Sequence, residues 1–157
     1  MIVKLVGASL LVSSSAYCAH RMISVERERI NRLSAYIDII LHIKSQIDLY
    51  SLPIEKILRS IDRSVLDRIE AASHPSRFDD LISLDDQYVG EGTQKILREF
   101  SSSLGKGYRE MQIKLCDKTI SELENQKKEL TDAFPSRKKT IIALCFAVCG
   151  MALIALI

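Results

Sequence analysis

Residues 108–134, YREMQIKLCDKTISELENQKKELTDAF, carry the clearest structural pattern in the chain. Along this stretch apolar side chains recur every three or four residues, and charged side chains occupy the other faces. The apolar stripe consists of Ile113, Cys116, Ile120, Leu123, Leu130 and Phe134, and Lys127 interrupts it. The spacing predicts a long amphipathic helix that ends at Pro135, because proline disrupts a helix interior.

A second long helix is predicted over residues 23–50. Its apolar face consists of Ile30, Leu33, Tyr36, Ile37, Ile40, Ile43, Ile47 and Tyr50, and Lys44 interrupts it. This face is broader than the narrow seam of a two-stranded coiled coil, so it favours packing in a helical bundle. We expect the two long helices to pack against each other in an all-α domain.

Shorter helices are predicted between the two long ones. Pro53 suits the first turn of a helix that follows it and ends near Asp62, because its missing N–H would have no partner there. Residues 64–72 continue the helical pattern until His74 and Pro75 end it. A helix over residues 93–104 then precedes a turn that is marked by two glycines, Gly105 and Gly107.

The C-terminal end of the chain is strongly apolar. Residues 140–157, TIIALCFAVCGMALIALI, contain no charged residue. As a helix they would be about 27 Å long, close to the ~30 Å hydrocarbon core of a bilayer. Arg137, Lys138 and Lys139 precede them directly, and basic residues beside a span tend to stay in the cytoplasm. We expect a transmembrane helix here.

The N-terminal segment, residues 1–20, is also apolar but shorter. An uncleaved transmembrane anchor is the expectation, and a signal peptide cleaved after Ala16 is the alternative. Only Lys4 precedes the apolar part, whereas four arginines follow it. These are Arg21, Arg27, Arg29 and Arg32. The charge distribution favours the anchor, with the middle of the chain in the cytoplasm.

The chain is thus expected to have three parts: an N-terminal transmembrane helix over residues 1–20, a cytoplasmic helical domain over 21–136, and a basic flank with a C-terminal transmembrane helix over 137–157. Residues 20–136 hold 18 Lys and Arg against 20 Asp and Glu, a net charge near −2. This balance argues against nucleic acid as the main partner.

Acidic residues concentrate between residues 76 and 92. They are Asp79, Asp80, Asp85, Asp86 and Glu91, and Arg77 is the one basic residue among them. This stretch fits a solvated connector, a docking surface for a basic partner or a calcium site. The spacing of an EF-hand and its glycine are absent, which disfavours calcium. The five acidic residues are our candidate partner-docking residues.

No pattern for catalysis or for a cofactor is present in the sequence. The three histidines, His20, His42 and His74, have no metal-ligand spacing to one another or to a cysteine. Nucleophile motifs and dinucleotide fingerprints are absent, and the Leu-Gly-Lys-Gly sequence at residues 104–107 lacks the strand and the Lys-Ser/Thr pair of a phosphate loop. We therefore expect a protein that is not an enzyme and that holds no cofactor or metal.

Two local motifs and their order resemble the stage III sporulation protein AB family. Residues 52–58, LPIEKIL, are similar to the family's Pro-Leu-x-Glu-Ala-Leu stretch. Leu104 and Gly105, with Gln112 downstream, resemble its Leu-Gly-x-Ser-Asp segment and following Gln. Gly107 and Tyr108 replace the Ser and Asp, which removes the expected cap of the last helix.

The resemblance implies a fold, a role and partners. The family is similar to the inner-membrane platform protein of type II secretion and type IV pilus systems, so it implies an antiparallel bundle of about six helices, flanked here by two transmembrane helices. It also implies a non-catalytic subunit of the sporulation channel between mother cell and forespore, in the cell membrane, with its domain in the mother-cell cytoplasm. The implied partners are a traffic ATPase of the same operon, other membrane subunits of the channel and the lipid bilayer.

Two other functional hypotheses fit the residue pattern. A membrane-tethered coiled-coil scaffold that self-associates, without a channel role, would use the Ile113–Phe134 stripe. A secreted helical protein, cleaved after Ala16 and held by its C-terminal span, would have the opposite topology.

Overall fold

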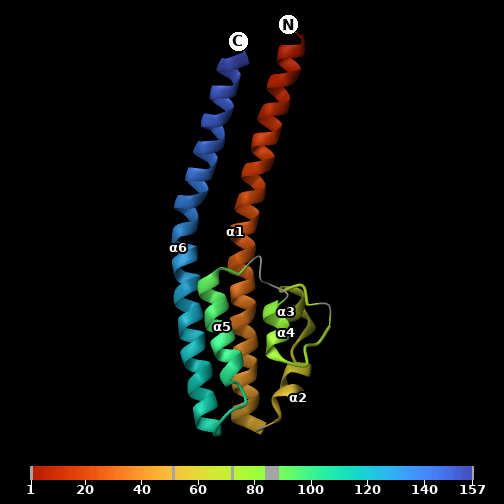
Figure 1. The fold of residues 1–157 in the computed structure, drawn as a ribbon, viewed down its shortest axis with the longest axis vertical. Coiled ribbons are helices and arrows are strands. Elements are labelled where there is room, and N and C mark those ends of the chain that lie inside the picture. Colours follow the sequence, from red (N-terminus) through yellow and green to blue (C-terminus); the bar gives the residue numbers. More distant parts are fainter. Residues whose placement is uncertain (1, 51, 72, 84–88, 157) are drawn as a thin grey trace. The chain divides into compact units, whose positions relative to one another are not determined.

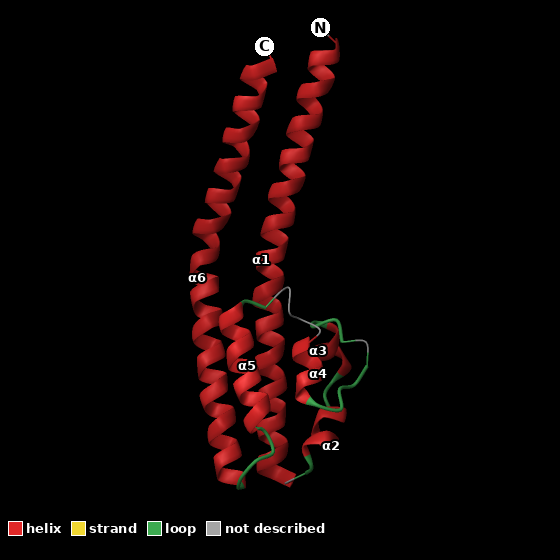
Figure 2. Cartoon of the chain, in the orientation of Figure 1, coloured by secondary structure: helices red, strands yellow, loops and turns green. Residues whose placement is uncertain are grey.

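The computed structural model describes residues 2–50, 52–71, 73–83 and 89–156, and the side chains of residues 7, 13–50, 52–71, 73–82, 89–148, 150 and 151. Over these residues the chain forms six helices and no strand (Figures 1 and 2). The helices are α1 (Ile2–Tyr50), α2 (Ile54–Arg59), α3 (Arg63–Asp67), α4 (Phe78–Ser83), α5 (Glu91–Ser103) and α6 (Arg109–Leu156). The expected all-α fold class is confirmed.

The limits of the two long helices differ from the prediction. The N-terminal segment and the helix expected from residue 23 form one continuous helix, α1. The prediction that Pro135 ends the last helix is wrong, because α6 continues through it to Leu156. Pro135 cannot donate an N–H to the Thr131 carbonyl, which costs about 3 kcal/mol in a helix interior. The helix-favouring residues on both sides, such as Ala133 and Lys138, keep the helix intact across this defect.

The chain divides into two compact units. The first consists of Met1–Glu28 with Thr131–Ile157, and the second of Arg29–Leu130. Helices α1 and α6 each contribute residues to both units. The sequence-based limits at residues 20 and 136 concern a membrane boundary and stay predictions.

Helix α1 contacts three of the shorter segments of the second unit. The buried Tyr36 hydroxyl donates to the Leu81 carbonyl in α4 at 2.9 Å. His42 lies 3.0 Å from Ser60, the residue that follows α2, and Asp38 pairs with Arg68, the residue that follows α3.

Helices α1 and α6 lie side by side in the second unit (Figure 1). Asp48 pairs with Arg109 at 2.6 Å, and Lys44 pairs with Asp117. Because the pairing advances in opposite directions along the two helices, they are antiparallel.

The predicted apolar stripes form the core of this unit. Buried side chains of α1 are Leu33, Tyr36, Ile37, Ile40, Ile43 and Ile47, and those of α6 include Cys116, Ile120 and Leu123. Leu97 and Phe100 of α5 are also buried in this core. Tyr50 is the exception to the predicted stripe, because its side chain is 65% exposed.

The connection between α2 and α5 contains one helix that is shorter than predicted and one helix that is not predicted. Helix α3 ends at Asp67, five residues before the predicted end, and α4 forms inside the acidic stretch 76–92, where no helix is predicted. Glu70 follows α3 with a φ of 55°, a left-handed conformation. Its carboxylate pairs at 3.0 Å with Arg32, which is 1% exposed. Arg32, counted above as a basic flank residue, thus belongs to the interior of the bundle.

The turn between α5 and α6 uses the two predicted glycines. Gly105 and Gly107 have φ values of 79° and 106°, which residues other than glycine rarely adopt. The side chain of Gln112 accepts from the Gly105 N–H at 2.9 Å and donates to the carbonyls of Ser103 and Lys106. Gln112 therefore holds the turn, although the cap expected in the family is replaced by Gly107 and Tyr108.

In the part of the chain that is described, none of the helices carries an apolar stretch long enough to cross a bilayer. Much of both predicted spans, namely residues 1–6, 8–12, 149 and 152–157, lies outside the described side chains. The two transmembrane helices stay predictions.

Candidate docking surface

The acidic stretch proposed as a docking surface is described only in part. Asp79 and Asp80 lie in the first turn of α4 and Glu91 lies in the first turn of α5, whereas Asp85 and Asp86 lie outside the described residues. The docking role of these five residues stays a prediction.

Asp80 has a structural task in α4. Its Oδ2 accepts from the backbone N–H groups of Arg77 at 2.9 Å and Ser76 at 3.2 Å. A carboxylate in the first turn that accepts these orphan donors stabilises the start of a helix. Replacing Asp80 would therefore disturb α4 as well as any docking surface.

Asp79 lies at an open cleft of about 230 Å³ where α2, α4 and α5 meet. Its carboxylate accepts from the Ser101 hydroxyl and lies 4.0 Å from the Arg77 guanidinium. The cleft is lined by Ile54, Glu55, Leu58, Ser76, Arg77, Phe78, Asp79, Ser101 and Leu104. Phe78 lines the cleft and is also a core residue. Its ring meets the ring of Phe100 edge to face, with centroids 5.0 Å apart.

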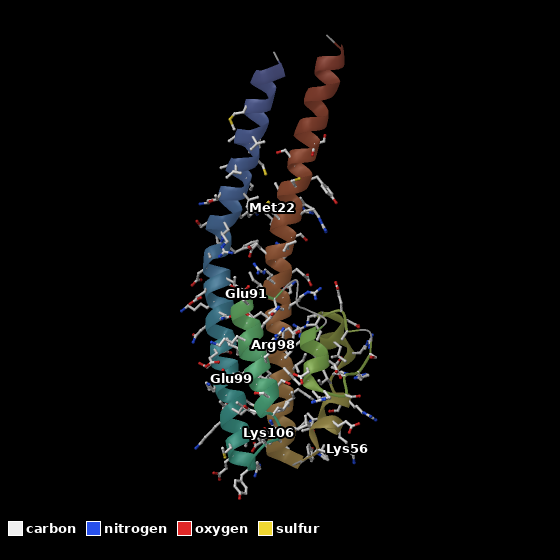
Figure 3. All side chains as sticks on the ribbon, in the orientation of Figure 1. Met22, Lys56, Glu91, Arg98, Glu99 and Lys106 are labelled. Carbon is white, nitrogen blue, oxygen red and sulfur yellow. The ribbon has the colours of Figure 1, made fainter. Side chains whose placement is uncertain are left out.

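Glu91 lies far from Asp79. Ser101, which binds Asp79, is ten residues after Glu91 in the same helix, a distance of about 15 Å along the axis. Figure 3 shows Glu91 at one end of α5 and Lys106 just beyond its other end. The described acidic residues thus occupy two separate places on the second unit and do not form one patch.

The sequence reasoning missed an apolar surface at one end of the second unit, which we call the apolar tip. It consists of five exposed side chains: Leu49, Tyr50, Leu52, Tyr108 and Met111. They come from the end of α1, the segment that leads into α2 and the residues around the start of α6, and these three parts lie together in Figure 1. The signal in the sequence is that Leu49 falls outside the apolar stripe of its helix.

Titratable groups of the second unit are tuned by structural contacts. A hydrogen bond from Lys44 to Asp117 raises the pKa of that lysine, and a hydrogen bond from Lys118 to Glu99 does the same. Burial raises the pKa of the Cys116 thiol to about 11, so it is protonated at neutral pH and is not an activated nucleophile. Among the described residues no three His, Cys, Asp or Glu side chains are grouped so that they could hold a metal ion.

In the first unit, large apolar side chains of α6 remain exposed. Leu144, Phe146, Val148 and Met151 are each exposed by more than half, as is Tyr17 of α1. Apolar side chains that repeat along a helix without cover mark a surface that meets a partner or a membrane.

Comparison with known proteins identifies one family. The family model described as stage III sporulation protein AB matches residues 82–157, which include α5 and α6. No curated protein and no solved structure matches the chain. The match includes residues 104–112, one of the two motifs that carry the resemblance, whereas residues 52–58 lie outside it. It supports a role in sporulation. Residues 82–157 are thus similar to the stage III sporulation protein AB family, and this match supports the family resemblance seen in the sequence.

Proposed function

We propose that this chain is a non-catalytic platform subunit of the sporulation channel between mother cell and forespore. Two membrane-spanning helix ends hold it in the cell membrane, and its helical bundle docks a traffic ATPase in the mother-cell cytoplasm. The family match over residues 82–157 is the observation that carries this proposal. Energy would come from the partner, since the sequence offers no nucleotide-binding motif.

The exposed apolar residues of the first unit support the membrane part of the proposal. Leu144, Phe146 and Val148 would be unfavourable in water but are suited to lipid contact. Arg137, Lys138 and Lys139 lie directly before this segment, where basic residues favour the cytoplasmic side.

Fractionation of cells that express the full chain tests the membrane part. We expect the chain to stay in the membrane pellet after alkaline carbonate washing. In a Cys18→Ser background, which removes the exposed native thiol, a cysteine introduced at the exposed Asn125 should be labelled by a membrane-impermeant maleimide only after the cells are broken. Labelling in intact cells would support the secreted alternative with the opposite topology.

Pull-down with the traffic ATPase tests the docking part. Because Asp80 stabilises α4, the acidic surface is better tested with Asp79→Lys and Glu91→Lys, singly and together. Glu124→Lys, at an exposed position of α6, is the matched control for charge reversal. Loss of ATPase binding in the first two variants alone would support the acidic surface, and unchanged binding in the double variant would remove it from the proposal.

The apolar tip is the second surface to test in the same pull-down. Tyr50→Ser and Tyr108→Ser change two side chains that are 65% and 84% exposed, so they should leave the bundle folded. Loss of binding here, with normal binding in the acidic variants, would place the ATPase at the tip.

The coiled-coil scaffold alternative loses its main support in the structure. It needs the Ile113–Phe134 stripe on the surface, but Cys116, Ile120 and Leu123 of that stripe are buried inside the second unit. We therefore favour the platform over the scaffold.

A further inference from the structure

The first unit contains a cleft whose lining residues have no part in the proposed docking function. It has a volume of about 260 Å³ and is open to solvent. Arg21, Met22, Val25 and Glu26 of α1 line it, together with Ile141 of α6. Figure 3 labels Met22 on α1 in this part of the chain.

The contacts around the cleft fix the two helix segments against each other. Arg137 pairs with Glu26 at 3.1 Å on one side of the cleft. On the other side, the Ser15 hydroxyl donates to the Cys145 carbonyl at 3.2 Å. The cleft between these contacts is therefore a defined feature of the helix pair within the first unit.

The cleft combines an apolar wall with one cationic side chain, that of Arg21. Met22 and Val25 are 54% and 40% exposed, and with Ile141 they form the wall. Glu26 is engaged by Arg137, whereas Arg21 has no hydrogen-bond or ion-pair partner among the described residues. A ligand that fits must therefore offer an anionic group to Arg21 and an apolar chain to the wall.

The charge of the first unit favours an anionic ligand. This unit contains six basic residues, Lys4, Arg21, Arg27, Arg137, Lys138 and Lys139, against three acidic ones, Glu26, Glu28 and Asp132. The second unit contains the remaining 16 basic and 17 acidic residues. The chain's excess of positive charge thus lies in the unit that holds the cleft.

We propose that this cleft binds an anionic phospholipid. The phosphate of the headgroup pairs with the Arg21 guanidinium, and an acyl chain lies along Met22, Val25 and Ile141. Basic residues beside a membrane-embedded segment attract anionic headgroups, and an arginine suits a phosphate through its forked donors. The inference rests on the proposed membrane anchoring and adds to it a site for one lipid class.

Native mass spectrometry of the full chain, released from nanodiscs, tests the proposal. The nanodiscs contain equal amounts of phosphatidylglycerol and phosphatidylcholine with the same acyl chains. We expect the wild-type chain to retain phosphatidylglycerol preferentially. Arg21→Gln should lower this preference about fivefold, the effect expected for one basic residue at a membrane surface. Equal retention of the two lipids by the wild-type chain would overturn the proposal.

The matched control is Arg27→Gln, because Arg27 is an exposed arginine of the same helix that does not line the cleft. Its lipid preference should stay within twofold of the wild-type value. An equal loss in both variants would mean that a diffuse field attracts the lipid, and it would overturn a site at the cleft.

Two further arms separate the possible occupants. Glycerol 3-phosphate has the headgroup chemistry without acyl chains, so it should not displace the retained lipid. Displacement of the lipid by glycerol 3-phosphate would mean that the cleft binds a free phosphate group, and it would overturn the lipid assignment. Met22→Trp, which fills the cleft, should also lower lipid retention. Unchanged retention in this variant, or a protein subunit bound there in place of lipid, would overturn the assignment.

Failure of the lipid proposal can be told apart from failure of the proposed function. A chain found in the carbonate-washed membrane pellet without lipid preference overturns the lipid site alone. A chain absent from that pellet contradicts the membrane anchoring, and the lipid proposal with it.

Discussion

Gln112 shows how much one side chain can do for the bundle. It is 6% exposed and serves three backbone groups of the α5–α6 turn. Gln112→Ala leaves these groups without their protein partner, so we expect a loss of about 1 kcal/mol in the free energy of unfolding. Urea unfolding of the full chain in detergent, followed by circular dichroism, measures the loss. Asn125→Ala, at an exposed position of α6, should change the free energy by less than about 0.5 kcal/mol.

Cys116 should give the bundle a dependence on alkaline pH. Its ordinary thiol pKa is 9.0, and burial first, then the nearby Asp117, raises it to about 11 in the folded chain. Folding therefore favours the protonated thiol, so this stability is fully present below pH 9 and is lost as the pH rises through about 11.

The comparison of wild type with Cys116→Ala isolates this effect from the lysines that titrate in the same range. We expect the variant to be less stable at neutral pH, because packing is lost, but to lose less stability than the wild type between pH 9 and 11. Parallel curves for the two proteins would contradict the assignment of the pH dependence to Cys116.

At the scale of the element, α3 depends on the N-cap residue that precedes it. Asp62 precedes α3, and its carboxylate accepts from the Ser64 N–H at 2.8 Å. This hydrogen bond lowers the pKa of Asp62, so its stabilisation is present above the ordinary value of 3.8 and is lost as the pH falls through the lowered pKa.

Two variants of Asp62 separate the hydrogen bond from the charge. Asp62→Asn keeps the cap and removes the titration, so its thermal midpoint should stay near the wild-type value at neutral pH and fall less in acid. Asp62→Ala should lower the midpoint already at neutral pH. Equal midpoints for all three proteins would show that α3 does not depend on this cap.

The elements that the sequence predicted well are those with long apolar periodicity. The stripes of α1 and α6 were visible because buried side chains repeat along many turns. Pro135 misled the prediction, since its cost is local whereas the helical preference of the flanking residues is summed over both sides. Helix α4 was missed because its six residues are too few to show a period.

The candidate sites were harder to predict than the helices. The density of acidic residues identified the stretch as a candidate, but it does not show that Asp80 stabilises the start of α4. It also does not show that Asp79, bound to Ser101, and Glu91 lie near opposite ends of α5. The apolar tip joins residues from α1, α6 and the connections before α2 and α6, and the cleft at Arg21 joins two segments far apart in sequence. Such surfaces depend on tertiary structure, which no local pattern encodes.

At the scale of the whole molecule, the two units differ both in buried apolar side chains and in net charge. Every buried apolar side chain described, from Leu33 to Leu123, belongs to the second unit. The first unit combines exposed apolar residues with an excess of basic ones. This division suits a chain in which one unit folds around its own core and the other unit is stabilised by a membrane.

The division predicts that residues 29–130 fold without the rest of the chain. The fragment keeps the whole described core and the antiparallel pairs of Asp48 with Arg109 and Lys44 with Asp117. We expect a water-soluble helical monomer that unfolds cooperatively in urea, as measured by circular dichroism and by light scattering after size exclusion. Leu97→Ala, at a side chain that is 1% exposed, should destabilise the fragment by about 3 kcal/mol. An elongated dimer would instead support the coiled-coil scaffold, and an unfolded fragment would mean that the core needs the first unit.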